Sequence, residues 1–73
     1  MSGFVRYGER NVNLDLIVDI LKSEHEANKN KTYYIFFYNG HSDTPYSSWI
    51  FDNELERDRA FNLLLEHMTN IEL

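Results

Sequence analysis

The 73-residue chain contains no cysteine, one proline and three glycines. The absence of cysteine excludes disulfide bonds and thiolate-ligated zinc, which many domains of this size use for stability. Because Gly3, Gly8 and Gly40 stand far apart, the chain has no glycine-rich loop to hold a phosphate group. A chain this short buries only about 60% of the surface that its unfolded form exposes. We therefore expect a single domain over 1–73 that relies on an aromatic core or on self-association for its stability.

Basic residues and long apolar runs are also scarce. Seven lysines and arginines stand against twelve acids, which gives a net charge of −5. Nucleic-acid binding draws most of its affinity from Lys and Arg at phosphates, so this balance disfavours a nucleic-acid partner and favours a basic protein partner. No apolar run is long enough for a signal peptide or a membrane span. We expect a soluble, cytoplasmic protein with no membrane association.

Aromatic residues, by contrast, are abundant and gather in one segment. Five of them lie between Tyr33 and Tyr38 in the stretch TYYIFFYNG. In a strand, successive side chains point to opposite faces. One face of this segment would carry Tyr33, Ile35 and Phe37, and the other Tyr34, Phe36 and Tyr38. Because one small core covers one face of a sheet, the second aromatic face needs a separate explanation.

The C-terminal half predicts two strands and a helix. The segments 32–39 and 47–51 are rich in aromatic and β-branched residues and are separated by the turn residues of GHSDTPY, which predicts an antiparallel pair. Asp52 or Asn53 can cap a helix whose first turn carries the acids Glu54 and Glu56, and Asn53 and Glu56 have the spacing of a capping box. Apolar residues then recur at helical spacing and predict a helix over 53–69. The members of this apolar stripe are Ala60, Phe61, Leu64, Leu65 and Met68.

The segment NVNLDLIVDILKSEHEANKNK allows two interpretations. Alternate positions over 12–20 are apolar, as in a strand. In a helix, Asn13 would cap the N-terminus and one face would carry Leu14, Ile17, Val18 and Leu21. The alternation and the β-branched content favour the strand, followed by a polar loop over 22–29. With an opening strand over Phe4–Tyr7, the order is β-β-β-β-α, and the helical alternative is β-α-β-β-α.

We therefore predict an α+β fold in which an antiparallel sheet of three to four strands packs on one C-terminal helix. The predicted core combines the helix stripe, one face of 33–38 and three residues of the ambiguous segment, Leu14, Leu16 and Val18. On the helix, Leu63 falls off the main stripe, on the side that carries Arg59. This position makes Leu63 a candidate for contact with a partner.

The pattern VNLDLIVDI, then the aromatic strand, then WIFDNELERDRAF resembles small uncharacterised bacterial and phage proteins. In those proteins an NLD strand and an aromatic strand precede a terminal helix that opens with acids and ERD. The resemblance covers most of the chain and implies a meander sheet backed by one helix. It also implies a phage or mobile-element accessory protein that binds and modulates a host protein. Its motifs are structural, so it assigns no functional residues.

No segment carries a catalytic signature. The string His41-Ser42-Asp43 holds the residue types of a hydrolytic triad, but a triad needs convergent geometry, and adjacent side chains point in different directions. The same residue types are typical of a solvated loop. His25, His41 and His67 have carboxylates nearby, without the spacing of a known metal site. We predict no enzymatic activity, no metal and no cofactor.

The second aromatic face leads to the functional hypotheses. Neighbouring strands cover it, or it is a protein–protein surface, since Tyr, Trp and Phe are enriched at such surfaces. A sheet that stacks single-stranded nucleic acid needs a basic groove, which the charge does not favour. A Tyr-lined cleft near 40–46 that binds a small molecule is a further alternative. We favour a non-enzymatic interaction module that binds a protein partner or a second copy, through Tyr34, Phe36, Tyr38, Tyr46, Trp49 and Leu63.

Overall fold

The computed structural model describes residues 3–68, which form five strands, a short 3-10 helix and one α-helix. In chain order these are β1 (Phe4–Tyr7), β2 (Arg10–Asn13), η1 (Leu14–Leu16), β3 (Asp19–Ala27), β4 (Asn30–Tyr38), β5 (Ser47–Phe51) and α1 (Glu54–Met68). β1 and β2 form a two-stranded antiparallel sheet, and β3, β4 and β5 form a three-stranded antiparallel sheet in that order. The predicted α+β fold with one C-terminal helix is confirmed, with the strands divided between two sheets.

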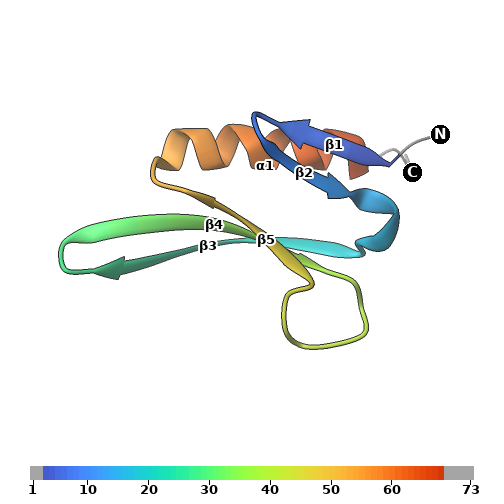
Figure 1. Ribbon diagram of the computed structural model, residues 1–73, viewed down its shortest axis with the longest axis horizontal. Coiled ribbons are helices and arrows are strands. Elements are labelled where there is room, and N and C mark those ends of the chain that lie inside the picture. The colour runs from blue at the N-terminus through green and yellow to red at the C-terminus, as the bar shows by residue number, and fades with distance from the viewer. Residues whose placement is uncertain (1–2, 69–73) are drawn as a thin grey trace.

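α1 and the β1–β2 hairpin lie on the same side of the three-stranded sheet (Figure 1). The inward side chains of β4 are completely buried beneath them at Ile35 and Phe37. Fully burying a large apolar side chain stabilises a fold by about 1.5–3 kcal/mol. The buried core consists of Val5, Val12, Ile17, Ile20, Ile35, Phe37, Trp49, Phe51, Ala60 and Leu64. On the other side of this sheet, no helix or strand of residues 3–68 covers it (Figure 1).

β3 and β4 form a long hairpin in which Asp19 pairs with Tyr38 and Ala27 pairs with Asn30. The two turn residues between the strands, 28 and 29, have φ angles of 53° and 66°. Positive φ at both central residues matches the two-residue turn whose twist fits a hairpin. The turn projects beyond the N-terminal end of α1 (Figure 1). The polar loop predicted over 22–29 is therefore wrong, because most of that segment is strand.

The segment 12–20 is neither one strand nor an α-helix, so both predictions for it are wrong. β2 ends at Asn13, whose side chain accepts a hydrogen bond of 3.0 Å from the Asp15 N–H. This bond caps η1, and β3 begins only at Asp19. The strand order is therefore β-β-β-β-β-α instead of β-β-β-β-α.

The break at η1 changes which apolar side chains are buried. Leu16 and Val18, which the alternation predicts in the core, are 48% and 67% exposed. Leu14 is only partly buried against the core. Ile17 and Ile20 are buried in their place. Because the chain turns between β2 and β3, a strict two-residue alternation across 12–20 assigns the wrong side chains to the core.

α1 begins where the sequence predicts it. The Asn53 side chain accepts a hydrogen bond of 3.1 Å from the Glu56 N–H, and the Asn53 carbonyl accepts one of 3.1 Å from the Arg57 N–H. The first bond satisfies one of the N–H groups that a helix start leaves without partners, and the second is the first backbone hydrogen bond of the helix. Residue 69, the last of the predicted helix, lies outside the described residues. α1 is too short and too polar to cross a membrane, and it is the only α-helix in residues 3–68.

The buried stripe of α1 is rotated from the predicted one. Ala60 and Leu64 are fully buried, as predicted, and Phe61 packs against the core. Leu65 is 37% exposed, so its assignment to the core is wrong. Arg57 takes the buried position one turn before Ala60, with 4% exposure. The inward face of the helix therefore begins with a charged residue.

Candidate protein-binding surface

Alternation along β3, β4 and β5 places a second set of side chains on the side of the sheet away from α1. The strand register arranges these side chains in rows across the sheet. We call this surface the outer face; its members are Asp19, Leu21, Ser23, His25, Thr32, Tyr34, Phe36, Tyr38, Ser48 and Ile50. Two rows, Leu21–Phe36–Ser48 and Ser23–Tyr34–Ile50, form its centre.

The centre of the outer face is apolar and open. Leu21 is 50% exposed and Ile50 is 55% exposed. Between them, the half-buried rings of Tyr34 and Phe36 stack with centroids 5.3 Å apart and an interplanar angle of 22°. The two rings shield each other, and Tyr tolerates such partial exposure because its hydroxyl stays in water. Within residues 3–68, the second aromatic face of β4 is therefore only partly covered, by side chains of the same face.

Formal charge is almost absent from the outer face. Asp19 is its one carboxylate and His25 its one imidazole, and none of the seven lysines and arginines belongs to it. Lys22 points the other way, with Nζ 3.5 Å from Asp58 Oδ1 and 5.2 Å from the centre of the Phe61 ring. Depletion of charge together with aromatic residues is the composition found at the centre of protein interfaces.

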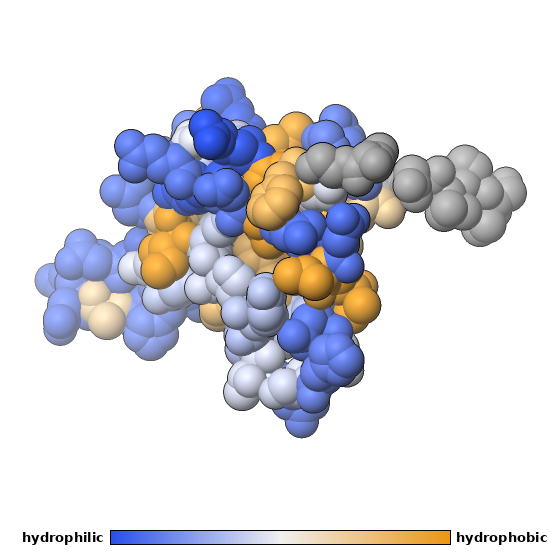
Figure 2. All heavy atoms as spheres, turned by 45° about the vertical axis from the view of Figure 1, so that its right-hand side comes forward, coloured by the Kyte–Doolittle hydropathy of each residue, from blue (hydrophilic) through white to orange (hydrophobic). Residues whose placement is uncertain are grey.

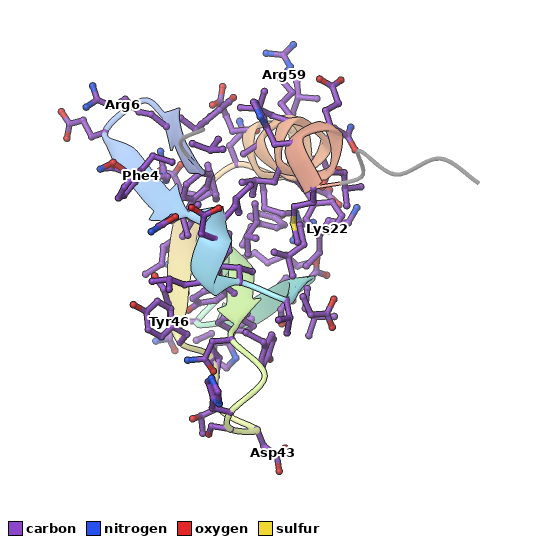
Figure 3. All side chains as sticks on the ribbon, turned by 90° about the vertical axis from the view of Figure 1, so that its right-hand side faces the viewer. Phe4, Arg6, Lys22, Asp43, Tyr46 and Arg59 are labelled. Carbon is purple, nitrogen blue, oxygen red and sulfur yellow. The ribbon has the colours of Figure 1, made fainter. Side chains whose placement is uncertain are left out.

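Other cations are also on the α1 side of the sheet. Lys31 Nζ lies 3.6 Å from Glu24 Oε2, and the negative charge of Glu24 raises the pKa of Lys31. Figure 3 shows Lys22 below α1, and Arg59 on the helix surface that faces away from the sheet. A basic groove around the stacked rings, which single-stranded nucleic acid requires, is therefore missing from the described residues.

The structure separates the residues predicted for partner contact. Tyr34, Phe36 and Tyr38 lie on the outer face. Trp49 does not belong to it, because it is 4% exposed and its ring centroid lies 5.2 Å from that of Phe37 in the core. Leu63 is partly buried and packs against the core. Trp49 therefore belongs to the inner face of the sheet and does not cover the outer face.

Tyr46 lies at the end of the sheet near the 39–46 loop and is 53% exposed. It borders a solvent-open groove of about 360 Å³, whose other lining residues are Asp15, Leu16, Val18, Asn39 and His41. In Figure 2, which brings this end forward, apolar side chains lie at the surface between polar ones. No buried polar side-chain atom in residues 3–68 lacks a hydrogen-bond partner, so the groove offers a ligand no buried, unsatisfied polar group. Small-molecule sites usually place a few polar groups inside an enclosed cavity, which this groove does not do.

The string 41–43 forms a loop and not a catalytic group. The His41 N–H donates a 3.0 Å hydrogen bond to Asn39 Oδ1, and Ser42 Oγ accepts one of 3.1 Å from the Thr44 N–H. Asp43 extends from the tip of the loop (Figure 3). These contacts are turn contacts, with no bond between Ser42 and the His41 ring. Within residues 3–68, no three His, Asp or Glu side chains converge as a metal site would require.

Arg57 holds the sheet against α1, and no pattern recognised in the sequence pointed to it. Its Nη1 donates a 2.7 Å hydrogen bond to the Ser23 carbonyl of β3, and its Nε donates one of 2.8 Å to Asp58 Oδ1. Its Nη2 lies 3.8 Å from Glu24 Oε1 and 3.7 Å from Glu54 Oε2. The hydrogen bond from Arg57 holds the pKa of Asp58 below its usual value. Arg57 thereby holds the backbone of β3 from the side of the sheet opposite the outer face.

The β1–β2 hairpin is joined to the same scaffold at the opposite edge. Arg10 Nη2 donates a 2.7 Å hydrogen bond to the Ile50 carbonyl, and its guanidinium lies 3.9 Å from the centre of the Phe51 ring. The Tyr7 hydroxyl donates a 3.2 Å hydrogen bond to Glu56 Oε1. Partial burial and this carboxylate raise the pKa of Tyr7. These contacts attach the hairpin to β5 and α1 without adding it to the three-stranded sheet, whose edge strands within residues 3–68 are β3 and β5.

Comparison with known proteins finds no family model, no curated protein and no solved structure that matches this chain. The geometry and composition of the outer face are therefore the basis for assigning a function.

Proposed function

We propose that the protein is a non-enzymatic interaction module that binds another polypeptide through the outer face. The observation that supports this proposal is the open, nearly uncharged centre, in which Leu21 and Ile50 are at least half exposed beside two stacked rings. Removing apolar surface from water stabilises a complex by about 25 cal/mol for each Å². Contiguous apolar patches on a monomer often mark such contact sites.

Two other modes of binding fit the surface less well. Single-stranded nucleic acid would meet the aromatic rings without any Lys or Arg beside them. Addition of a partner strand to the edge of β3 would meet Lys22, Glu24 and Glu26, and charged side chains are a common protection of sheet edges. If the module acts on a host protein, as the resemblance to phage proteins implies, the outer face is the surface that we expect it to use.

Site-specific photocrosslinking in cells tests the proposal. A benzophenone amino acid at position 36 keeps the aromatic character of Phe36, and the same group at Arg59 is the control on the exposed side of α1 (Figure 3). We expect a defined covalent adduct with a polypeptide, identified by mass spectrometry, from position 36 and none from position 59. The adduct should disappear when Leu21→Lys is added. No adduct from position 36, or equal adducts from both positions, would contradict the proposal, and so would a nucleic-acid adduct.

A further inference from the structure

We infer that the polypeptide bound by the outer face is a second copy of this chain. The two copies dock with their outer faces together. The two-fold axis lies between the two sheets, perpendicular to the strands, and passes over the row of paired residues Lys22–Ile35–Trp49. This inference rests on the proposed function, since it names the partner of the same surface. A two-fold interface uses one patch on both subunits, so the patch must complement itself under the rotation.

The rotation exchanges residues that lie equally far from the row on either side. On β3 it places Leu21 of one copy against Ser23 of the other. On β5 it places Ile50 against Ser48 of the second copy. Each exposed aliphatic side chain therefore meets a serine, which leaves room for it. Interdigitation of large and small residues is how two stacked sheets fill the space of about 10 Å between them.

The same rotation brings the aromatic rings at the centre of the two faces together. Phe36 of one copy lies over Tyr34 of the other, and this contact occurs twice because the axis relates the copies. Aromatic pairs in offset or edge contact are worth about 0.5–1.5 kcal/mol beyond the area that they bury. Tyr38 meets Thr32 at the margin, where both hydroxyl groups stay near water. The face therefore matches itself in the position of its large rings.

The charged residues of the outer face also fit this axis. Asp19 and His25 lie three residues on either side of the row, so the rotation brings Asp19 of each copy to His25 of the other. The Asp19 carboxylate accepts a 2.9 Å hydrogen bond from its neighbour Ile20 N–H and has lone pairs for a further donor. An imidazole ring can donate in either protonation state. A two-fold axis parallel to the strands would instead place β3 of one copy over β5 of the other, where Asp19 does not meet His25.

The size of the face sets the expected strength. Three strands spaced about 4.8 Å apart, each with about six residues of 3.3 Å rise, form a surface of roughly 20 by 14 Å. Two such faces bury on the order of 600 Å², which is below the range of stable complexes and typical of reversible ones. We expect a dissociation constant of about 10–100 μM, in line with so small an area. With a net charge of −5 on each copy, association should hold or strengthen as salt rises, whereas a contact with a basic partner would weaken.

Sedimentation equilibrium from about 5 μM to about 1 mM, a range that spans the expected dissociation constant, measures this association. We expect Leu21→Lys to weaken the dimer at least tenfold, because it places an ammonium group against the second copy. Leu55→Lys is the matched control, since Leu55 is 59% exposed and lies on α1 instead of the outer face. The control should leave the dissociation constant unchanged. Circular dichroism checks that both variants keep the fold.

A charge exchange tests the axis itself. His25→Glu places two carboxylates together at each end of the dimer, and Asp19→Lys removes the acceptor for His25. We expect each variant alone to weaken the dimer by up to tenfold, the effect of two exposed pairs. An equimolar mixture should restore association, because the ammonium group introduced by Asp19→Lys then meets the carboxylate introduced by His25→Glu, while the native pair forms at the second end. The axis parallel to the strands predicts no such restoration.

The outcomes separate this inference from the proposed function. A wild-type chain that remains monomeric at the highest concentration overturns the inference, whereas a position-36 adduct with a different polypeptide would still support the proposed function. A dimer that Leu21→Lys leaves intact uses another surface, which also overturns the inference. Weakening by Leu21→Lys without restoration in the mixture rejects the axis. The inference is supported when Leu21→Lys weakens the dimer, the mixture of charge variants restores association, and Leu55→Lys leaves the dissociation constant unchanged.

Discussion

Replacement of Arg57 by alanine should cost the fold much of its stability. Arg57 is 4% exposed and joins α1 to the Ser23 carbonyl of β3 through a 2.7 Å hydrogen bond. Its three carboxylate partners are much more exposed, at 46% for Glu24, 59% for Glu54 and 37% for Asp58. When the guanidinium is removed, these carboxylates can therefore return to water. The loss should be smaller than the roughly 3–5 kcal/mol that follows when a buried charge is left unpaired.

The magnitude follows from the contacts that disappear. A hydrogen bond from a charged donor contributes about 1.5–3 kcal/mol, and the two methylene groups that alanine lacks contribute about 0.8 kcal/mol each. Release of the arginine side chain returns up to about 2 kcal/mol of conformational entropy. The balance for Arg57→Ala is a loss of about 2–3 kcal/mol in the free energy of unfolding. A domain of this length has only about 4–11 kcal/mol in total, at about 0.05–0.15 kcal/mol per residue.

Urea unfolding followed by circular dichroism measures the loss. Arg57→Met keeps the apolar stem and should lose only about 1–2 kcal/mol, while Arg59→Ala on the exposed side of α1 should change stability by less than about 0.5 kcal/mol. The order Arg57→Ala, Arg57→Met, Arg59→Ala is the essential result. If Arg57→Ala unfolded at the same urea concentration as the wild type, the buried guanidinium would not be what joins α1 to β3.

Three further changes test single features of the fold by the same unfolding measurement. Asn53→Ala removes the cap of α1 and should lose about 1 kcal/mol, whereas an unchanged midpoint would mean that the cap bond contributes nothing. Lys29→Gly should gain about 1 kcal/mol, because φ at this turn residue is 66° and glycine adopts that region without strain; a loss would contradict the turn geometry. The hydrogen bond from Arg57 lowers the pKa of Asp58 from 3.8 in the folded protein. The contribution of the Asp58 carboxylate to the free energy of unfolding should therefore be complete above pH 3.8 and disappear as the pH falls through the lower pKa of the folded protein. Asp58→Asn should flatten this part of the profile of stability against pH.

The sequence predicts the second half of the chain well because local signals agree there with the tertiary structure. The aromatic run, predicted as strand over 32–39, forms most of β4 (Asn30–Tyr38), and 47–51 matches β5. The cap at Asn53 forms the predicted bond to Glu56. In each of these elements, propensity, turn residues and apolar period indicate the same structure. Such agreement between levels is what makes a segment predictable.

The segment from residue 12 to 29 shows the opposite case. Its apolar alternation runs unbroken through η1, where the chain turns, so the pattern contains no sign of the break. The hairpin turn at Asn28 and Lys29 lacks the glycine that usually marks such a turn. The charges of β3 are also unlike the amphipathic pattern expected of a strand. Contacts distant in sequence hold this region, among them the hydrogen bond from Arg57 to the Ser23 carbonyl.

Part of the candidate surface is also predictable. Strand alternation alone places Tyr34, Phe36 and Tyr38 on one face of β4, and the structure has the same set there. Which neighbours complete that face depends on strand order and register, which alternation within one strand does not supply. For this reason the sequence-based prediction places the buried Trp49 on the surface and misses Leu21 and Ile50.

The distribution of charge on β3 connects the stability of this domain to its proposed binding surface. In an antiparallel sheet with one solvated face, charged residues usually point to water and apolar residues to the core. β3 reverses this arrangement, because Lys22 and Glu24 point toward the α1 side, where they pair with Asp58, Lys31 and Arg57. The outward positions at the middle of the same strand are Leu21 and Ser23, with Asp19 and His25 toward its ends. Ion pairs around a buried arginine therefore support the inner side, and the side open to solvent has the composition of an interface centre.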